Sequence, residues 1–317
     1  MKDLHSLPKV RDSWSFPYLE HCRIDQEDKA IAAHDVKGKV PIPCASLTTL
    51  MLGPGTSITH AAVKALADNG CLVLWTGEGA VRFYALGMGE TRASRNLIWQ
   101  ARVSSHPDAR LQVVRRMYEM RFPEPLDRAL TIEQIRGMEG IRVRAAYAEA
   151  SKTTGVPWFG RSYKRDDWAK ADPINRALSA ANSCLYGVCH AAIVSAGFSP
   201  ALGFVHTGKM LSFVYDIADL YKTEVTIPMA FQAVAANVEH VEREIRLGCR
   251  DAFYAKRLLH RIIPDIEHAL GIKARRGDDG NDYDSGLNLQ GTLWDPESGE
   301  VEGGVNWADD TEGEVPS

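Results

Sequence analysis

Residues 203–222 hold the densest set of side chains capable of chemistry in this chain. His206, Asp216 and Asp219 lie within fourteen positions, and Lys209 and Lys222 accompany them. Asp216 and Asp219 are three residues apart, so on a helix they share one face. An imidazole, carboxylates and nearby ammonium groups suit a hard divalent cation bound next to a phosphate. The segment therefore predicts a metal-dependent site that acts on phosphate.

A further carboxylate, Glu139, lies in a predicted helix upstream. Thr131 and Gln134 have the spacing of a capping box, in which both side chains bind free backbone donors at a helix start. Four residues of this helix are spaced by four and stack along one face; they are Ile135, Glu139, Val143 and Tyr147. Burying a carboxylate in an apolar row is costly unless something pairs with it, which makes Glu139 a candidate ligand.

Two glycines beside Glu139 point in the same direction. Gly137 and Gly140 each cost a helix about 1 kcal/mol relative to alanine, so their presence suggests the close approach of another backbone or of a ligand. A divalent ion shared by Glu139, His206 and Asp219 accounts for both the glycines and the carboxylate.

Each candidate also has a plainer interpretation. A histidine near an apolar run is more often a core residue with satisfied nitrogens, and aspartates at i and i+3 more often form a solvated helix face. Glu139 has three arginines within reach as salt-bridge partners, namely Arg136, Arg142 and Arg144. Taken singly, these alternatives are favoured, and only the combination of residues favours a metal site.

The combination resembles a known family. The string Gly-Phe-Val-His206-Thr-Gly-Lys209, followed by Ser-Phe-Val-Tyr-Asp216-Ile-Ala-Asp219, resembles the CRISPR-associated adaptation integrase. This is the first of the two universal Cas adaptation proteins, and the chain is similar to its type I-E subtype. Further matching stretches occur in the same order at 51–56, 60–63, 137–145, 183–187 and 244–251. The resemblance spans roughly residues 10–270.

The resemblance implies a reaction and its residues. Glu139, His206 and Asp219 are implied to bind the catalytic Mg²⁺ or Mn²⁺, with Asp216 close by. The metal polarises a backbone phosphate, and the 3′-hydroxyl of a short DNA fragment attacks the CRISPR repeat. Lys209 and Lys222 are candidates for positioning the phosphate or protonating the leaving group.

The resemblance also implies partners. They are double-stranded DNA, as pre-spacer fragments and CRISPR repeat, a second copy of the chain in a homodimer, and the second universal adaptation protein. Two positions depart from the family pattern. Ser57 replaces a basic residue, and the place of an aromatic residue that splays duplex ends falls on His21, with Tyr18 nearby. These departures concern DNA contacts of the N-terminal domain and leave the metal site untouched.

Basic residues gather on predicted helices. Arg243, Arg246 and Arg250 are spaced three and four apart, hence on one face. We expect them to bind DNA together with Lys209 and Lys222, although a solvated face is the plainer interpretation. A second cluster, for which a structural role is favoured, consists of Arg110, Arg115, Arg116 and Arg121. The aromatic residues expected in the core are Tyr163, Trp168 and Tyr186.

Charge is divided unevenly along the chain. The 317 residues carry 37 Lys and Arg against 41 Asp and Glu, a net charge of −4. Residues 277–317 hold twelve acids and no Lys or Arg, and subtracting them leaves 29 acids against 37 basic residues, a net charge of +8. A basic body attracts polyanions such as DNA. The acidic tail is either an inert extension, which is favoured, or a local competitor for the DNA surface.

Composition bounds the remaining classes. Six cysteines without zinc-like pairing of their spacings indicate reduced thiols in a cytoplasmic protein. The N-terminus lacks a secretory hydrophobic region, and no run of eighteen apolar residues occurs. We therefore expect no membrane as a partner.

The pattern predicts two domains and a tail. Residues 1–90 read as a mainly β domain, β-sandwich-like with one helix, which would serve dimerisation and contacts with DNA and the partner. Its predicted strands are 14–23, 30–34, 47–52, 71–75 and 81–86, and its helix is 57–69. Residues 91–276 read as an all-α, metal-binding catalytic domain. Residues 277–317 read as a disordered acidic tail with at most a weak hairpin at 293–305.

The helical domain carries clear boundary signals. Asp172 precedes Pro173, which marks a capped helix start with proline at the first position. Further helices are predicted over 213–221, 228–237 and 241–270, the last one broken or kinked at Pro264.

Two rival functions stay open beside the integrase. A stand-alone, structure-selective metal nuclease would use water in place of the 3′-hydroxyl at the same site. A non-enzymatic DNA-binding dimer would act as a scaffold, but a scaffold has no need of Glu139, His206 and Asp219 together.

Overall fold

The computed structural model describes residues 17–27, 30–44, 47–88, 94–161, 172–237, 241–272, 293–296 and 299–301. The chain divides into a main unit, residues 10–278, and a smaller one made of residues 1–9 and 279–317. In the smaller unit, β9 (Leu293–Asp295) pairs antiparallel with β10 (Gly299–Val301). The weak hairpin predicted there is formed, while the rest of the tail predicted as disordered lies outside the described residues.

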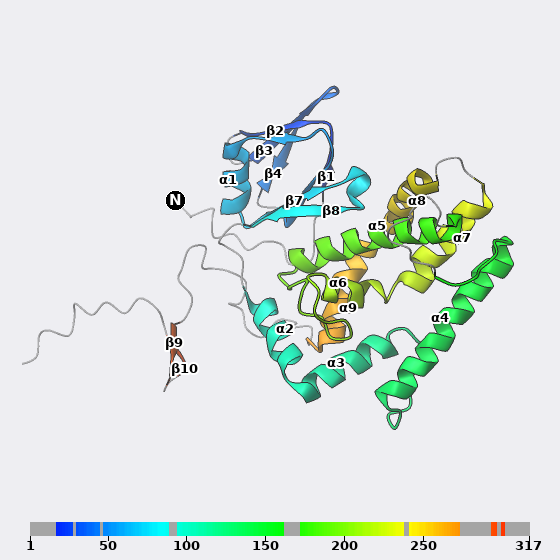
Figure 1. The fold of residues 1–317 in the computed structure, drawn as a ribbon. Helices are drawn as coiled ribbons and strands as arrows, with labels where there is room; N and C mark the ends of the chain where they lie inside the picture. The colour runs from blue at the N-terminus through cyan, green and yellow to red at the C-terminus, as the bar shows by residue number, and fades with distance from the viewer. Residues whose placement is uncertain are drawn as a thin grey trace, which may run out of the picture. The chain divides into compact units, whose positions relative to one another are not determined.

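The described residues of the N-terminal part of the main unit form two four-stranded sheets and one α-helix (Figure 1). One sheet has the order β1 (Tyr18–Leu19), β5 (Thr49–Leu52), β7 (Leu72–Thr76), β8 (Phe83–Gly87). The other has the order β4 (Gly38–Pro43), β3 (Ala30–Asp35), β2 (Arg23–Glu27), β6 (Ser57–Ile58). The helix is α1 (His60–Asp68), and a short 3₁₀ turn, η3 (Glu78–Ala80), precedes β8. The β-rich N-terminal region predicted from the sequence is confirmed.

A shared apolar core joins the two sheets to α1. Ile24 and Ile31 of one sheet, Leu50 of the other and Leu66 of α1 are all fully buried in it. The helix starts at the Thr59 cap, whose hydroxyl accepts a hydrogen bond from a backbone N–H in the first turn. The helix predicted over 57–69 begins only at His60, because Ser57 and Ile58 form strand β6.

Two strand predictions were wrong in detail. β4 was not predicted, because Pro41 and Pro43 demote its sequence; the structure accommodates both prolines on the edge of the sheet. The strand predicted over 14–23 is replaced by β1 and β2. Between them His21 has a positive φ of 51°, and its N–H donates to the Pro54 carbonyl at 2.9 Å. This left-handed residue interrupts the strand.

The remainder of the main unit is helical. Its elements are α2 (Arg95–Ser105), α3 (Pro107–Glu119), α4 (Ile132–Thr154), α5 (Pro173–Ser195), α6 (Ser212–Ala218), a π-helical turn η5 (Lys222–Thr226), α7 (Ile227–Ala235), α8 (Val241–Ala255) and α9 (Leu258–Leu270). The Thr131–Gln134 capping box starts α4, and the Asp172 side chain caps α5 by accepting from the Asn175 N–H at 2.7 Å. Both predicted helix starts are confirmed.

The break between α8 and α9 lies earlier than predicted. It falls at Arg257, which has a φ of 47°, whereas Pro264 lies inside α9. A non-glycine residue in the left-handed region ends the continuous helix here. Of the two outcomes predicted at Pro264, the break is therefore wrong, and the kink stays a prediction.

Helix α5 is the central element of the helical part. It is long and apolar enough to cross a membrane, but 72% of its most apolar window is buried inside the protein. Leu178, Leu185 and Cys189 are among its fully buried side chains. Burial in the core accounts for the apolar character of this helix.

The same helix also packs on the β-rich part. Ala191 and Val194 of α5 pack against Leu72 and Leu74 of β7. The buried Thr49 hydroxyl donates to the Ser195 hydroxyl at 2.8 Å. Figure 1 shows α5 running beneath the sheet edge formed by β7 and β8. The two parts of the main unit are therefore joined by a buried interface along one face of α5.

The packing at this interface predicts that alanine substitutions at two helical glycines change the stability in opposite directions. A Cβ on Gly187 of α5 would lie 2.6 Å from the Val81 carbonyl oxygen, whereas a Cβ on Gly137 of α4 would meet nothing within 4 Å. We expect Gly187→Ala to lower the free energy of unfolding by about 1–3 kcal/mol through overpacking. Gly137→Ala should raise it by up to about 1 kcal/mol through helix propensity. Urea unfolding of both variants would measure the difference, and equal stabilities would contradict the close packing.

Candidate active site

His206 is held by the buried carboxylate of Asp216. The His206 Nδ1 lies 2.7 Å from Asp216 Oδ1, and the same oxygen accepts from the His206 backbone N–H at 2.8 Å. A carboxylate accepts hydrogen bonds, so Nδ1 carries the proton and Nε2 keeps a lone pair free for a ligand. This hydrogen bond raises the pKa of His206, against the opposite effect of its partial burial.

Both carboxylate oxygens of Asp216 are occupied by hydrogen bonds from the protein. Its other oxygen, Oδ2, accepts from the backbone N–H groups of Phe204 at 2.6 Å and Val205 at 3.1 Å. With a side chain that is 0% exposed, Asp216 has both oxygens occupied by protein donors. The geometry therefore favours a role in positioning His206 for Asp216, which the resemblance implies only to lie close to the metal ligands.

Asp219 turns to other partners despite its spacing of three from Asp216. It is the C-cap residue directly after α6, and its carboxylate oxygen lies 2.6 Å from the Lys222 ammonium. Burial lowers the pKa of Lys222, but the charge of Asp219 raises it, and the net shift is upward. Lys222 opens the π-helical turn η5, a wide turn that is frequent at functional sites. The two aspartates thus divide into a buried anchor and a 21% exposed carboxylate.

Glu139 projects from α4 and is paired with two arginines. Arg142 binds it bidentately, with distances of 2.7 Å and 2.9 Å. Arg142 also donates to the Thr223 hydroxyl of η5 at 3.0 Å, which ties α4 to the turn beside Asp219. The sequence offered three arginines as salt-bridge partners of Glu139. Arg142, three residues further along α4, forms this salt bridge.

Arg121 brings the two carboxylates to one point. Its Nη1 lies 3.5 Å from Glu139 Oε1 and 4.0 Å from Asp219 Oδ2. Glu139 comes from α4 and Asp219 from α6, whereas Arg121 follows the end of α3. Side chains from three separate elements therefore converge around a single guanidinium nitrogen.

Aromatic rings connect this cluster to His206. The His206 ring packs edge-on against Tyr215, with centroids 5.9 Å apart, and Tyr215 packs edge-on against Tyr186 at 5.0 Å. The Lys222 ammonium lies 5.0 Å from the centroid of the Tyr186 ring. Tyr186 is thus part of the site wall as well as of the core expected from the sequence, while Tyr163 and Trp168 lie outside the described residues.

The donor set fits a hard divalent cation. Two carboxylates and an imidazole nitrogen are ligands that Mg²⁺ and Mn²⁺ accept. Across the described ranges, no three His, Cys, Asp or Glu residues are close enough to hold an ion as they stand. Arg142 and Lys222 hold the carboxylates of Glu139 and Asp219, and Arg121 supplies positive charge between them. Binding an ion therefore requires these cations to yield part of their contacts.

The glycines of α4 behave differently from the prediction. Gly137 has open space on its side-chain position, and the nearest atom to a Cβ on Gly140 is the end of Arg144, at 3.6 Å. The expected close approach of another backbone was therefore wrong. Both glycines lie beside Glu139 on a helix of which only Ile135 is fully buried, so α4 keeps a largely open surface (Figure 1).

The predicted DNA-binding residues lie at or near the surface. Lys209 is exposed, and on α8 Arg243 and Arg250 are exposed while Arg246 is half-buried. Arg250 reaches the β-rich part, because its side chain carbons lie about 3.1 Å from the Cβ position of Gly79 in η3. The spacing of α8 places these arginines on one face.

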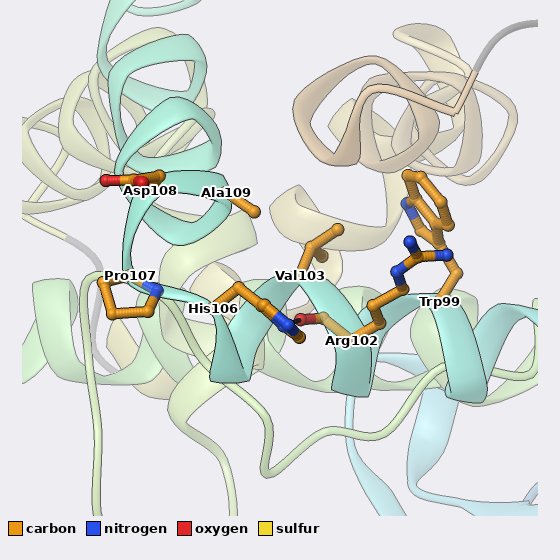
Figure 2. A pocket seen from close by; sticks show the side chains of 7 residues that line it. All are labelled: Trp99, Arg102, Val103, His106, Pro107, Asp108 and Ala109. Atoms are coloured by element: carbon orange, nitrogen blue, oxygen red, sulfur yellow. Dashed lines mark hydrogen bonds between the residues drawn. The ribbon is translucent and has the colours of Figure 1, made fainter.

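A pocket of about 440 Å³ lies apart from the candidate ligands, at the corner between α2 and α3 (Figure 2). It is lined by Trp99, Arg102, Val103, His106, Pro107, Asp108 and Ala109. Glu139, His206 and Asp219 are not among its lining residues. This pocket is therefore separate from the candidate ligands.

Sequence reasoning missed the roles of two residues. Arg121 was grouped with structural arginines, and Asp216 was grouped with Asp219. A weak signal existed for Asp216, because an aspartate in the apolar run Phe-Val-Tyr-Asp-Ile-Ala must find partners if it is buried. No periodicity relates Arg121 to Glu139, since a turn separates α3 from α4.

The fold and the cluster define a class of two-part proteins, in which a β-rich part precedes a helical part that gathers carboxylates, cations and an imidazole. Residues 119–243 match the family model described as CRISPR associated protein Cas1. A relative from Thermus thermophilus, named CRISPR-associated endonuclease Cas1 2, is 53% identical over 314 residues, covering 99% of this chain and 96% of its own. CRISPR-associated endonuclease Cas1 of Escherichia coli is 47% identical, covering 84% and 88%. The chain belongs to the Cas1 family.

Solved structures agree with this membership. The crystal structure of a TtCas1–DNA complex has a TM-score of 0.78 and 55% identity, covering 83% of this chain and 99% of that one. A casposase bound to an integration product has a TM-score of 0.55 at 15% identity, a likeness of fold alone. The β-rich N-terminal and helical C-terminal arrangement is that of the Cas1 fold.

The partners of Asp216 predict a contrast in stability. We expect Asp216→Ala to lower the free energy of unfolding by about 3 kcal/mol, because three backbone N–H groups and His206 Nδ1 lose a charged acceptor. His206→Ala should cost less than about 1 kcal/mol, because the side chain is 43% exposed. Thermal and urea unfolding, with the exposed Asp251→Ala as a control, would measure both. Equal losses for Asp216→Ala and Asp251→Ala would contradict the anchoring role.

Proposed function

We propose that this Cas1 protein joins short DNA fragments to the CRISPR repeat at a divalent-metal site formed by Glu139, His206 and Asp219. The class of function predicted from the sequence, an endonuclease and integrase of CRISPR adaptation, is confirmed by the family membership. The residue roles, the metal and the partners are the proposal.

The observation that carries the proposal is the convergence of two carboxylates on Arg121. Glu139 and Asp219 are eighty positions apart, yet both approach the same guanidinium nitrogen, within 3.5 Å and 4.0 Å. Two carboxylates held this close repel each other unless a positive charge lies between them. Such a pair, with a free imidazole nitrogen presented by the adjacent segment, is a site prepared for a cation.

Each ligand is prepared by its neighbours. Asp216 fixes the His206 ring so that Nε2 faces away from the protein backbone. Arg142 and Lys222 hold the carboxylates of Glu139 and Asp219 until a cation and a phosphate replace them. When bound, Mg²⁺ or Mn²⁺ polarises the scissile phosphate and neutralises charge that develops on its oxygens.

The chain's own cations then position the DNA. Lys209 is exposed three residues after His206, and Lys222 and Arg142 are both partly exposed beside the carboxylates. Their charges attract the phosphate that carries the reaction. The 3′-hydroxyl of a fragment attacks the repeat phosphate and a DNA 3′-oxygen leaves, so no protein nucleophile is required. With water as nucleophile, the same arrangement cleaves DNA.

The DNA path proposed beyond the site follows α8. Arg243, Arg246 and Arg250 lie on one helix face, and residues 1–276 carry a net charge of +8. The solved complex of TtCas1 with DNA supports DNA as the partner. Pre-spacer fragments and the CRISPR repeat remain the substrates that the motif resemblance implies.

Several finer assignments belong to the same proposal. They are the type I-E subtype, Mg²⁺ or Mn²⁺ as the ion, the homodimer, the second universal adaptation protein as partner, and the cytoplasm as location. The division into domains 1–90 and 91–276 is likewise proposed, with dimerisation and partner contacts on the first. Support for these assignments comes from the motifs around Glu139 and His206 and from the composition of the chain.

The ligand roles predict the effect of three substitutions. His206→Ala, Asp219→Ala and Glu139→Ala should each abolish strand transfer while leaving DNA affinity nearly unchanged, because one ligand fixes the ion and many basic residues hold the backbone. A labelled fragment and a plasmid carrying the repeat, assayed with and without the second adaptation protein, would measure joining and cleavage separately. Glu149→Ala, an exposed glutamate of α4, is the matched control.

The outcomes of this assay separate the alternatives. A variant that keeps near-wild-type joining in Mg²⁺ or Mn²⁺ would remove that residue from the ligand set. Cleavage without any joining by the wild-type protein would support the stand-alone nuclease, and neither activity would support the scaffold.

The α8 surface predicts a change in salt dependence. Each phosphate contact contributes about −0.9 to the slope of log K against log salt on duplex DNA. Removing Arg243 and Arg246 together should therefore flatten the slope by about 1.8 and weaken binding to all sequences about equally. The double Arg→Lys variant keeps both charges and is the control. A loss confined to one DNA sequence would mean that these arginines read bases.

A further inference from the structure

Arg121 is a permanent positive charge inside the candidate metal site. Its side chain is only 4% exposed, and its guanidinium lies 5.0 Å from the centroid of the Tyr118 ring. Two of its nitrogens, Nε and Nη2, are buried without a hydrogen-bond partner. An arginine cannot lose its proton in a protein, so this charge stays in place whatever binds nearby.

Positioning alone does not explain the contacts of Arg121. It reaches Glu139 and Asp219 with a single nitrogen at 3.5 Å and 4.0 Å, longer than the 2.7–2.9 Å, roughly, of charge-assisted hydrogen bonds. Arg142 and Lys222 already hold these carboxylates at 2.7 Å and 2.6 Å. Arg121 therefore acts on them mainly through its charge, at the expense of two unsatisfied donors.

The balance of charge around the carboxylates is positive. Among the described residues of this cluster, Arg121, Arg142 and Lys222 face Glu139 and Asp219, three cations to two anions. Arg142 and Lys222 have long, partly exposed side chains that can swing toward solvent or DNA. The buried Arg121 cannot follow them. A divalent ion that enters would then meet a fixed like charge a few ångströms away, in surroundings where such repulsion is strong.

We propose that Arg121 makes metal binding depend on DNA: its charge weakens binding of a divalent ion by the free protein, and the phosphate of bound DNA brings negative charge into the site that offsets this repulsion. The inference rests on the proposed function, in which Glu139 and Asp219 are metal ligands. In the free protein Arg121 balances the two carboxylates in place of the ion. When a phosphate arrives, Arg142 and Lys222 can pair with it, and the site then gains the negative charge that a divalent ion needs.

Manganese titration calorimetry tests the proposal on the full-length chain. Wild-type protein should bind Mn²⁺ weakly alone and at least about tenfold more tightly with a duplex lacking 3′-hydroxyls, which cannot react. Arg121→Met, which keeps the length and removes the charge, should bind Mn²⁺ at least about tenfold more tightly than wild type without DNA. It should also gain less from DNA. Arg121→Lys should behave like wild type.

The sign of the change separates charge from structure. Damage to the site by Arg121→Met would weaken Mn²⁺ binding, so an equal or weaker affinity in a protein with a cooperative unfolding transition overturns the inference. Arg176→Met is the matched control, because Arg176 pairs with Glu242 at 2.6 Å between α5 and α8, and it should leave Mn²⁺ affinity unchanged. If Arg176→Met tightened Mn²⁺ binding as much as Arg121→Met does, this result would also overturn the inference.

The failure of the underlying function has a different signature. Glu139→Gln in the wild-type background should abolish Mn²⁺ binding in the presence of DNA. If binding persists, the assignment of Glu139 as a ligand fails, and the inference fails with it. If Glu139→Gln abolishes binding but Arg121→Met does not tighten it, the metal site stands and the role of Arg121 alone is refuted.

Discussion

The carboxylate of Asp216 is the interaction on which the rest of the site depends. It accepts hydrogen bonds from the backbone N–H groups of Phe204, Val205 and His206 and from the His206 ring. One buried anion therefore fixes the conformation of residues 204–206. Gly203 completes this turn, because a Cβ there would collide with the His206 carbonyl oxygen. A buried carboxylate is tolerated only when its charge is compensated in this way. Because the buried charge of Asp216 requires hydrogen-bond donors, the His206 ring is held with Nδ1 toward Asp216.

A second level of organisation is the pairing of two partly buried anions with partly buried cations. Glu139 and Asp219 are each held by a partner that follows three residues later on its own segment, Arg142 and Lys222. In the proposed function these pairs exchange for contacts with a phosphate and a metal ion. Arg121 differs because it comes from another element and is buried. The same five side chains therefore give a resting cluster of three cations and two anions, and two of these cations can pair with a DNA phosphate.

Much of the fold could be predicted from local signals, and the failures have physical causes. The capping box at Thr131 and the Asp172 cap fixed the starts of α4 and α5, because these signals act within one turn. β4 escaped prediction because its prolines are acceptable only on a sheet edge, which is a tertiary property. Glu139 and His206 stood out by chemistry within their own segments. The role of Arg121 depends on how α3, α4 and α6 pack, and no spacing along the chain encodes that packing.

Helix α5 links the β-rich part to the chemistry. At one end its Ser195 accepts the Thr49 hydroxyl from the sheet, and near its middle the buried Asn182 accepts from the Thr226 hydroxyl of η5 at 2.8 Å. Tyr186 lies one turn further and supports Lys222. A wide π-helical turn has no strong preference of its own and needs such tertiary bonds to persist. Helix α5 therefore does more than fill a core. It binds the turn that places Lys222 beside Asp219, and it also packs against the sheet of the β-rich part.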